Sequence, residues 1–359
     1  MSKLKVNSRV IVIGASAGGL DALKKIIAGL PHDFPHAIFV VWHLAPSSTS
    51  MLPVILNKLN TLPAAHAIDN EPLIGGRIYV APPDRHLVIE KNLVRVTRGP
   101  KENMFRPAID PLFRSAAYYH RERVTGIILS GAMDDGTAGL WNIKYRGGFT
   151  IVQEPDEAEE PSMPANALRA VQVDLRLPAA AIAGALQGNF SAPQKISFEL
   201  IPDENLPENG SELTEIAVAL EKEIPYEDIM ALGQASRLSC PECHGVLSAI
   251  QESGRSRFRC HTGHAYSANS LLAGVGDAIE ISLWNSLRAA EEKLFLLNMI
   301  GDEYAALNQP AEASVCFSSA RRTQHLATVI KYLAEQVDTC SIEAFHAGLE
   351  ALRRAGKTE

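Results

Sequence analysis

Cysteine is scarce in this chain of 359 residues and is absent from its first 239 positions. The total of five is odd, and Cys240, Cys243 and Cys260 lie close together. A framework of disulfide bonds, as in small secreted domains, does not fit this pattern. The grouping instead indicates a metal site in a protein of a reducing compartment.

Long apolar runs and an excess of positive charge are also missing. No stretch reaches the roughly 18 consecutive apolar residues of a membrane-spanning helix, and the start MSKLKVNSRVIVIG lacks the features of a secretion signal. The 34 Lys and Arg against 41 Asp and Glu give a net charge of -7, which argues against binding to nucleic acid. We expect a folded cytoplasmic protein that meets membranes only through other proteins.

The first half of the chain alternates short apolar runs with segments of helical pattern. Continuous apolar strands are typical of a parallel sheet whose two faces are covered by helices. We therefore predict a doubly wound α/β domain over residues 1–190, with a mostly parallel sheet and one antiparallel pair. The strands expected in the sheet are Val10–Ile13, Ala37–Trp42, Arg77–Val80 and Val124–Leu129, and those of the antiparallel pair are His86–Glu90 and Leu93–Arg98.

The second half has a different composition. Residues 191–236 are rich in Pro, Asn, Glu and Ser and are predicted to form a linker. A small Cys-rich module is expected at 237–273, followed by a helical region at 274–359 with later helices at 311–337 and 341–354. Apolar residues from Ile279 to Leu297 recur at three- and four-residue spacing, which predicts an amphipathic helix. Self-packing is the first interpretation of its apolar stripe.

A glycine-rich loop, Gly14–Gly19, separates the first expected strand from the first helix. Glycines permit a sharp turn, and the free N–H groups of a helix N-terminus can hold negative charge. Ser16 in this loop is a candidate nucleophile beside an oxyanion hole. The alternatives are that Ser16 caps the helix or that the loop binds a nucleotide phosphate. The second is disfavoured, because the dinucleotide fingerprint needs a glycine at Ser16 and no Gly-Lys-Ser/Thr follows.

A serine nucleophile needs a histidine within hydrogen-bond reach and usually a carboxylate behind it. His43 follows the second expected strand, and His86 is its main competitor. Asp134 and Asp135 follow the strand that ends at Leu129, and the pattern alone does not choose between them. Either aspartate could instead cap the next helix. Because active sites of open α/β sheets lie at the carboxyl ends of strands, these groups are expected at one edge of the sheet.

The same residues lie in six ordered blocks that resemble the catalytic domain of the chemotaxis protein-glutamate methylesterases of the CheB type. The resemblance covers about residues 8–190. It implies that Ser16 is the nucleophile, that His43 is the general base and acid, and that Asp135 orients the histidine. The blocks are IGASAGG (Ile13–Gly19), VVWHLAPSSTSMLP (Val40–Pro53), YVAPPDRH (Tyr79–His86), RPAIDPLFRSAA (Arg106–Ala117), ILSGAMDDGTAGL (Ile128–Leu140) and PSMPANAL (Pro161–Leu168).

The resemblance also implies a reaction, which is hydrolysis of glutamate γ-methyl esters on methyl-accepting chemotaxis receptors. Methanol is released and no cofactor takes part in catalysis, while some relatives also deamidate receptor glutamines. The backbone N–H of Ala17 would serve the oxyanion hole. His86, Arg106 and Asp110 are expected near the mouth of the site, where they would receive the receptor or have a structural role.

Two positions depart from the family pattern. Ala17 stands where threonine is common, and the usual Gly-Met-Gly before the aspartate is Gly131-Ala132-Met133. Regulated members carry a receiver domain before the esterase, so control by phosphorylation of such a domain is not expected here. The alternative function is a catalytically weak scaffold that keeps the esterase fold and binds signalling partners through the Cys-rich module and the helices.

The cysteine pattern predicts a structural zinc site. A C-x2-C pair is followed, after 16 residues, by Cys-x3-His. Three thiolates and an imidazole suit tetrahedral zinc, and a closed set of four ligands stabilises a fold rather than catalysing a reaction. His244 and His261 are alternatives to the preferred histidine. The predicted ligands are Cys240, Cys243, Cys260 and His264. The run RCHTGHAYS is also similar to a module at the C-terminus of some methylesterases without a receiver domain.

Overall fold

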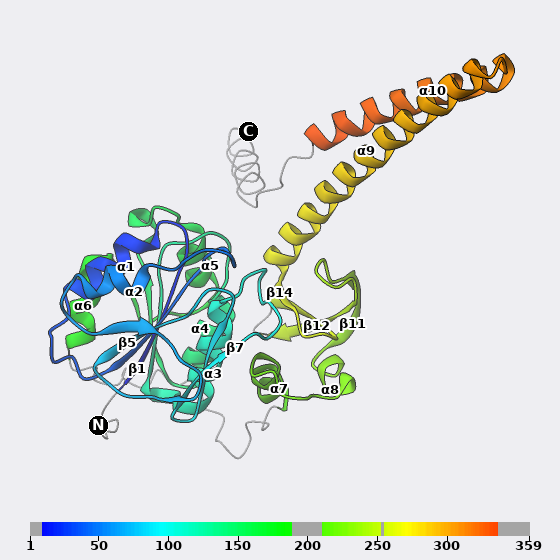
Figure 1. The fold of residues 1–359 in the computed structure, drawn as a ribbon. Coiled ribbons are helices and arrows are strands. Elements are labelled where there is room, and N and C mark those ends of the chain that lie inside the picture. Colours follow the sequence, from blue (N-terminus) through cyan, green and yellow to red (C-terminus); the bar gives the residue numbers. More distant parts are fainter. Residues whose placement is uncertain (1–8, 189–209, 253–254, 337–359) are drawn as a thin grey trace, which may run out of the picture. The chain divides into compact units, whose positions relative to one another are not determined.

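A computed structural model describes residues 9–188, 210–252 and 255–336 of the chain. The chain divides into two compact units, Met1–Ser270 and Leu271–Glu359. Within the first unit, a large α/β domain is followed by a small sheet that carries three of the cysteines (Figure 1). The part of the second unit that the structure describes, up to residue 336, consists of long helices.

The α/β domain is built on a seven-stranded sheet in the order β10-β9-β8-β1-β2-β5-β3. All neighbouring strands in it are parallel, so the predicted doubly wound fold is confirmed. The four strands predicted from the sequence are present, with small shifts at their ends. The bounds are β1 Val10–Ala15, β2 Ala37–Trp42, β3 Ala64–His66, β5 Arg77–Val80, β8 Val124–Ile128, β9 Phe149–Gln153 and β10 Leu175–Leu177.

Helices cover both faces of this sheet and bury it between two apolar cores (Figure 1). Along β1, Val10 and Val12 point into one core, and Ile11 and Ile13 point into the other. This explains why the strand is apolar throughout rather than alternating. The helices on the Val10 side are α3 (Ile109–His120), α4 (Thr137–Tyr145) and α5 (Ser162–Ala170), and those on the Ile11 side are α1 (Gly19–Ala28), α2 (Leu52–Asn57) and α6 (Ala179–Gln187).

A second, antiparallel sheet has the order β4-β7-β6. Its strands are β4 (Glu71–Pro72), β6 (His86–Glu90) and β7 (Leu93–Thr97). The predicted antiparallel pair is therefore confirmed, with Glu90 opposite Leu93 across a tight turn. Lys91 in this turn has a φ of 57°, which two-residue hairpin turns require. Two short 3-10 helices, Arg121–Arg123 and Pro155–Glu157, complete the domain.

The structure differs from the predicted linker at residues 191–236. Helix α7 (Gly210–Ala219) and helix α8 (Tyr226–Met230) both fall within this range. Ile216, Ala219 and Leu220 of the α7 region share a small apolar core with Val88 of β6. The polar composition of the stretch concealed an apolar face at helical spacing, and burial of that face fixes the helix. Residues 189–209, the first part of the predicted linker, lie outside the described residues.

A four-stranded antiparallel sheet follows, in the order β11-β12-β13-β14. Its strands are β11 (Gln234–Ser239), β12 (Val246–Glu252), β13 (Arg255–Cys260) and β14 (Ala265–Ser267). We call the described residues between 234 and 270 the Cys/His module.

The second unit contains most of α9 (Ala268–Ala306) and α10 (Pro310–Gln336). Leu287 and Ala290 of α9 share a core with Ala327 of α10, so these helices pack on each other. This agrees with the predicted helices from Ile279 and from residue 311, while the stretch expected at 341–354 lies outside the described residues. None of the described helices combines the length and apolar character needed to cross a bilayer.

Candidate functional site

Three neighbouring strands of the large sheet, β8, β1 and β2, end at the same edge and carry the candidate residues. Ser16 directly follows β1, and its backbone N–H donates to the Ser130 carbonyl after β8, at 3.0 Å. His43 directly follows β2, and its backbone N–H donates to the Ala15 carbonyl at 3.1 Å. Backbone pairing that continues past the strand ends therefore brings the two loops next to the loop after β8.

His43 and Asp135 form a buried pair at this edge. His43 Nε2 lies 2.8 Å from Asp135 Oδ2, and both side chains are almost fully buried. The imidazole ring is stacked on the ring of Phe105, with 3.8 Å between the ring centroids and 8° between the planes. The sequence pattern did not choose between Asp134 and Asp135 as the partner of His43. The structure favours Asp135, because its carboxylate contacts the histidine.

The Asp135 carboxylate is held by several further donors. Its Oδ2 accepts from the Ile109 N–H at 2.7 Å, and its Oδ1 accepts from the Asn103 amide and the Gly136 N–H, each at 2.9 Å. Burial alone would raise the pKa of Asp135, but the hydrogen bond from His43 and these other donors outweigh it and lower the pKa. Asp135 is therefore an ionised acceptor at neutral pH.

The other ring nitrogen of His43, Nδ1, is buried and has no hydrogen-bond partner among the described residues. Since an ionised carboxylate can only accept, the neutral ring carries its proton on Nε2. Nδ1 is then an unprotonated acceptor on a residue whose backbone is hydrogen-bonded to Ala15, the residue before Ser16. No hydrogen bond joins Ser16 Oγ to His43 among these residues, as is common before substrate binds.

The Ser16 loop is fixed by its backbone. Trp42 Nε1 donates to the Ser16 carbonyl at 2.9 Å, and Ser130 Oγ donates to the Ala17 carbonyl at 2.8 Å. Ser16 is half-buried and Ala17 is exposed. Gly131 packs so closely that a Cβ atom there would lie 2.8 Å from the Ser16 Cβ. This close approach explains a glycine at position 131.

Of the three residues expected near the mouth of the site, His86 and Asp110 are buried, which fits their alternative, structural role. His86 is fully buried, and its Nε2 donates to the Pro100 carbonyl at 2.9 Å while burial lowers its pKa. Asp110, also buried, accepts from the Gly139 N–H at 2.7 Å. Burial and the nearby charge of Asp135 raise the pKa of Asp110. Neither side chain is offered to a macromolecule at the surface, and both hold backbone groups instead.

Arg106 is partly exposed and forms an ion pair with Asp84 at 2.7 Å. Its guanidinium also donates to the Gly99 carbonyl at 2.9 Å. Asp134, the second aspartate of the loop, accepts from Ser267 Oγ at 2.7 Å. Burial raises the pKa of Asp134.

Sequence reasoning missed Asn103, Phe105 and Trp42, although each touches the candidate residues. Asn103 and Phe105 lie in an irregular segment before α3, where no hydrophobic period marks a residue as buried. Trp42 lies at the end of a predicted strand, but nothing in the sequence indicates the acceptor of its indole N–H.

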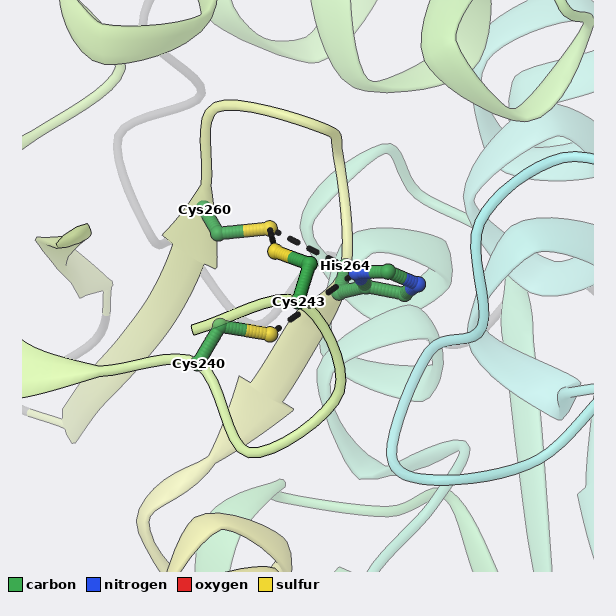
Figure 2. A group of neighbouring side chains, drawn as sticks. All are labelled: Cys240, Cys243, Cys260 and His264. Carbon is green, nitrogen blue, oxygen red and sulfur yellow. Dashed lines mark hydrogen bonds between the residues drawn. The ribbon is translucent and has the colours of Figure 1, made fainter. Parts of the chain in front are cut away.

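The four predicted metal ligands form one group in the Cys/His module (Figure 2). Their ligand atoms all lie within 4.8 Å of one another. His264 Nδ1 is 3.7 Å from Cys240 Sγ and 3.6 Å from Cys260 Sγ, and the sulfurs of Cys243 and Cys260 are 3.6 Å apart. His244 and His261, the alternative ligands, are not part of the group.

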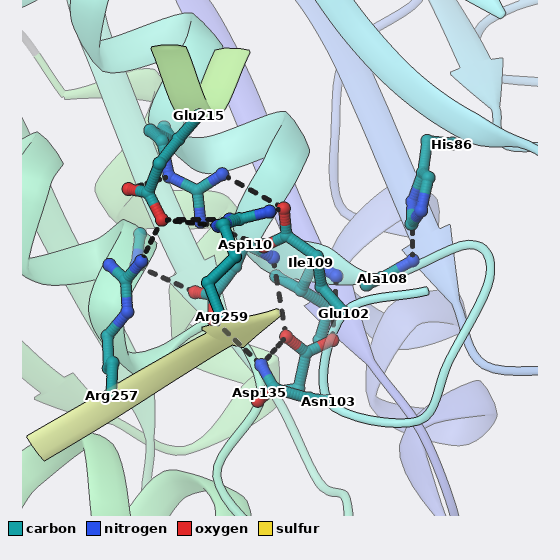
Figure 3. A network of polar contacts seen from close by, with 12 residues as sticks. His86, Glu102, Asn103, Ala108, Ile109, Asp110, Asp135, Glu215, Arg257 and Arg259 are labelled. Carbon is teal, nitrogen blue, oxygen red and sulfur yellow. Dashed lines mark hydrogen bonds and ion pairs between the residues drawn. The ribbon is translucent and has the colours of Figure 1, made fainter. Parts of the chain in front are cut away.

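A buried ionic network joins the module and α7 to the α/β domain (Figure 3). Arg114 donates to both oxygens of Glu102, at 3.2 and 2.8 Å. Arg259 of β13 donates to Glu102 at 2.9 Å and to Glu215 of α7 at 2.8 Å. Arg257, which is also on β13, forms an ion pair with Glu215. Although burial would raise the pKa values of both glutamates, the arginines outweigh it and lower them.

The sheet order and the site together define a class, which is a doubly wound α/β domain with serine, histidine and aspartate at the carboxyl edge of a parallel sheet. The family model described as CheB methylesterase matches residues 11–186. A protein of Leptospira interrogans named as a putative protein-glutamate methylesterase/protein-glutamine glutaminase is 41% identical over 170 residues, which are 47% of this chain and 88% of that protein. The chain therefore belongs to the CheB methylesterase family.

Two further proteins are similar to this chain. Protein-glutamate methylesterase/protein-glutamine glutaminase 2 of Anaeromyxobacter dehalogenans is 39% identical over 178 residues, which are 50% of this chain and 52% of that protein. The crystal structure of the CheB methylesterase catalytic domain of Thermotoga maritima covers 50% of this chain and 98% of its own, with 33% identity and a TM-score of 0.48.

Proposed function

We propose that this protein is a protein-glutamate methylesterase that hydrolyses glutamate γ-methyl esters by a Ser16-His43-Asp135 mechanism. The observation that carries the proposal is the buried His43–Asp135 pair, at 2.8 Å, which leaves Nδ1 of the ring without a partner. The names of the relatives support the same activity.

In the proposed reaction, Ser16 Oγ attacks the ester carbonyl carbon and its proton passes to His43 Nδ1. The tetrahedral intermediate collapses as the bond to the methoxy oxygen breaks, and the Nδ1 proton leaves with that oxygen as methanol. Water then attacks the acyl-enzyme and gives a proton to Nδ1. The bond to Ser16 Oγ breaks, Ser16 Oγ takes that proton back, and the glutamate side chain is released as a carboxylate. Throughout, Asp135 accepts the Nε2–H and stabilises the imidazolium that forms.

The developing oxyanion needs backbone donors at the start of α1. The exposed Ala17 N–H is the donor we propose, and because it belongs to the main chain, alanine can supply it as well as threonine. The same steps on a glutamine side chain would release ammonia in place of methanol. The relatives' second name, protein-glutamine glutaminase, favours this as an additional reaction.

The proposed substrate is a methyl-accepting chemotaxis receptor, so we place the protein in the cytoplasm, where it meets the membrane only through that receptor. Arg106 is the one of the three expected mouth residues that is partly exposed, and we keep it as a contact for the receptor.

The test is methanol release from receptor membranes carrying labelled methyl esters. Ser16→Ala should abolish turnover, with a loss of about 10⁴-fold or more. Ser286→Ala on α9, which removes an exposed serine far along the chain, is the matched control and should keep full activity. Loss of release in both variants, or equal release from Ser16→Ala and the unmodified protein, would contradict the proposed nucleophile. No release from any form, across several receptors, would favour the scaffold function instead.

We also propose that the four clustered ligands of the Cys/His module bind structural zinc. With zinc-to-sulfur bonds of about 2.3 Å, tetrahedral geometry places ligand atoms about 3.8 Å apart. The separations of 3.6 and 3.7 Å fit this arrangement. Tyr266 Oη lies 3.3 Å from Cys240 Sγ, so its hydroxyl can support that thiolate. Zinc bound here would join the β11–β12 turn to the β13–β14 turn.

Metal analysis of the purified, reduced protein should find about one zinc per chain, because one closed set of four ligands binds one ion. Cys243→Ser should lower the zinc content, whereas Cys316→Ser removes a thiol of α10 and should not. A metal-free protein after gentle purification would contradict the zinc proposal.

A further inference from the structure

Asn103 lies between the candidate catalytic aspartate and the Cys/His module (Figure 3). Its side chain is buried, with 5% of the residue exposed. The amide nitrogen donates to Asp135 Oδ1 and to Asp110 Oδ2, each at 2.9 Å. The amide oxygen accepts from the Ser267 N–H at 2.8 Å and from Ser270 Oγ at 2.9 Å.

These four contacts use every hydrogen-bonding site of a carboxamide, which has two N–H donors and two acceptor lone pairs. The orientation of the amide is therefore fixed. Rotating it by half a turn would aim its oxygen at the carboxylates of Asp135 and Asp110, and its N–H groups at the donors of Ser267 and Ser270. The amide oxygen would then face the ionised Asp135 carboxylate, and an amide N–H would face the fixed Ser267 N–H, so Asp135 and the module together favour the observed arrangement.

The module also holds the backbone of this segment. The Asn103 N–H donates to the Ala265 carbonyl at 2.8 Å, and the Ala265 N–H donates to the Lys101 carbonyl at 3.2 Å. Asn103 has a φ of 52°, a left-handed conformation that asparagine tolerates better than most residues. Lys101 and Asn103, the residues on either side of Glu102, are thus paired with Ala265 of β14, which begins directly after His264.

The pairing is reinforced next to Asn103 by charge. Glu102 precedes Asn103 and forms ion pairs with Arg114 of α3 and Arg259 of β13. It therefore binds both the α/β domain and the Cys/His module. All three side chains are buried. Displacing the module would break these ion pairs and the Asn103 contacts at once.

We propose that Asn103 is a positioning residue for Asp135 and that the Cys/His module acts through it to hold the catalytic aspartate in place for His43. The proposal rests on the proposed function, because it assigns Asp135 to the orientation of His43. The amide separates two neighbouring carboxyl groups and gives each a donor. Without it, Asp135 keeps its contacts to backbone N–H groups and loses its side-chain support, so the carboxylate is free to tilt away from His43 Nε2.

The test combines kinetics with a spectroscopic signal of the His43–Asp135 pair. Methanol release from methylated receptor membranes gives kcat and KM. The proton on His43 Nε2 is followed as a low-field proton resonance, which is assigned by its disappearance in His43→Gln. The variants are Asn103→Ala and Asn103→Asp, and Ser270→Ala tests the contact from the module. Ser256→Ala, on β13, is the matched serine control because its partner is Gln251 of the same sheet.

Asn103→Ala should lower kcat about ten- to one-hundred-fold, the range for losing one buried hydrogen bond to a charged group. KM should change much less, because Asn103 is buried and does not meet substrate. The Nε2 resonance should shift or broaden. Asn103→Asp should be at least as damaging as Asn103→Ala, since it places a third carboxyl group beside Asp135 and Asp110. Ser270→Ala should show a smaller effect of the same kind, and Ser256→Ala should show none.

An Asn103→Ala protein that keeps kcat within twofold and an unchanged resonance would overturn the proposal. If Asn103→Ala does not fold, Ser270→Ala decides, and an unchanged resonance in that variant overturns the part assigned to the module. If the unmodified protein releases no methanol, the proposed function fails separately. In that case a resonance that moves in the Asn103 or Ser270 variant still supports the positioning, and one that does not move overturns it.

Discussion

Glu102 is the residue whose change tests most directly how the Cys/His module is held on the α/β domain. Its buried carboxylate accepts three charge-assisted hydrogen bonds, two from Arg114 and one from Arg259, at 2.8 to 3.2 Å. Glu102→Gln keeps the shape of the side chain and removes its charge. Arg114 and Arg259 then share Glu215 as their remaining buried carboxylate.

The cost of this change follows from the count of contacts. Each hydrogen bond to a charged group contributes about 1.5 to 3 kcal/mol, but the amide oxygen of glutamine can still accept from one arginine. The amide nitrogen faces the other arginine as a like donor. We expect a loss of about 3 to 5 kcal/mol in the free energy of unfolding, as for other buried ion pairs that lose one partner. For a unit of this size, the unfolding midpoint should fall by about 10 °C.

Urea and thermal unfolding of Glu102→Gln, followed by circular dichroism, measure this loss. Glu154→Gln is the control, because it breaks an exposed ion pair with Arg176 and should not change stability measurably. A Glu102→Gln protein as stable as the control would refute the reasoning, since it would mean that the network is hydrated and that the module is held by other contacts.

Two further predictions follow from the same contacts. Gly131→Ala should lower methanol release at least tenfold, because its Cβ would lie 2.8 Å from the Ser16 Cβ and 2.6 Å from Met163 Cε, whereas Gly184→Ala in α6 meets open space and should keep full activity. Because the folded-state pKa values of Glu102 and Glu215 are lowered, their contribution to stability is complete above about pH 5, where unfolded glutamates are ionised, and is lost as the pH falls below about 4. The unfolding midpoint of the unmodified protein should therefore fall more steeply between pH 5 and 3 than that of Glu102→Gln, and parallel curves for the two proteins would contradict this assignment.

The large sheet could be predicted because the apolar sequences of its strands indicate that both faces of the sheet are buried. β1 and β2 are buried on both faces, so nearly all their residues are apolar, and short runs of this kind are typical of the strands of a parallel sheet. The short turn around Lys91 could be predicted equally well. Helix α7 could not, because Glu212 and Glu215 give it the composition of a linker, and these acids are paired with arginines from distant parts of the chain.

The candidate site was predictable to the extent that chain order and strand ends determine it. Ser16 and His43 each stand one residue past a strand, and parallel neighbours place such residues side by side. The choice of Asp135 over Asp134 was not accessible from the pattern, because it depends on which carboxyl group faces His43. The burial of His86 and Asp110 was also hidden, since polar residues at the ends of elements carry no periodic signal.

The contacts between the Cys/His module and the candidate site could not be predicted from composition. With 34 basic and 41 acidic side chains, nothing in the chain marks Arg259 as the partner of Glu102, 157 residues away. Once the fold brings them together, both loop aspartates are held from the module, Asp134 by Ser267 Oγ and Asp135 through Asn103. Because Asp134 and Asp135 are adjacent and each is linked to the Cys/His module, neither can move relative to the module without straining the contacts of the other. The loop after β8 is therefore held in part by residues that follow the α/β domain in the sequence, and that domain alone does not contain all the groups that contact the candidate site.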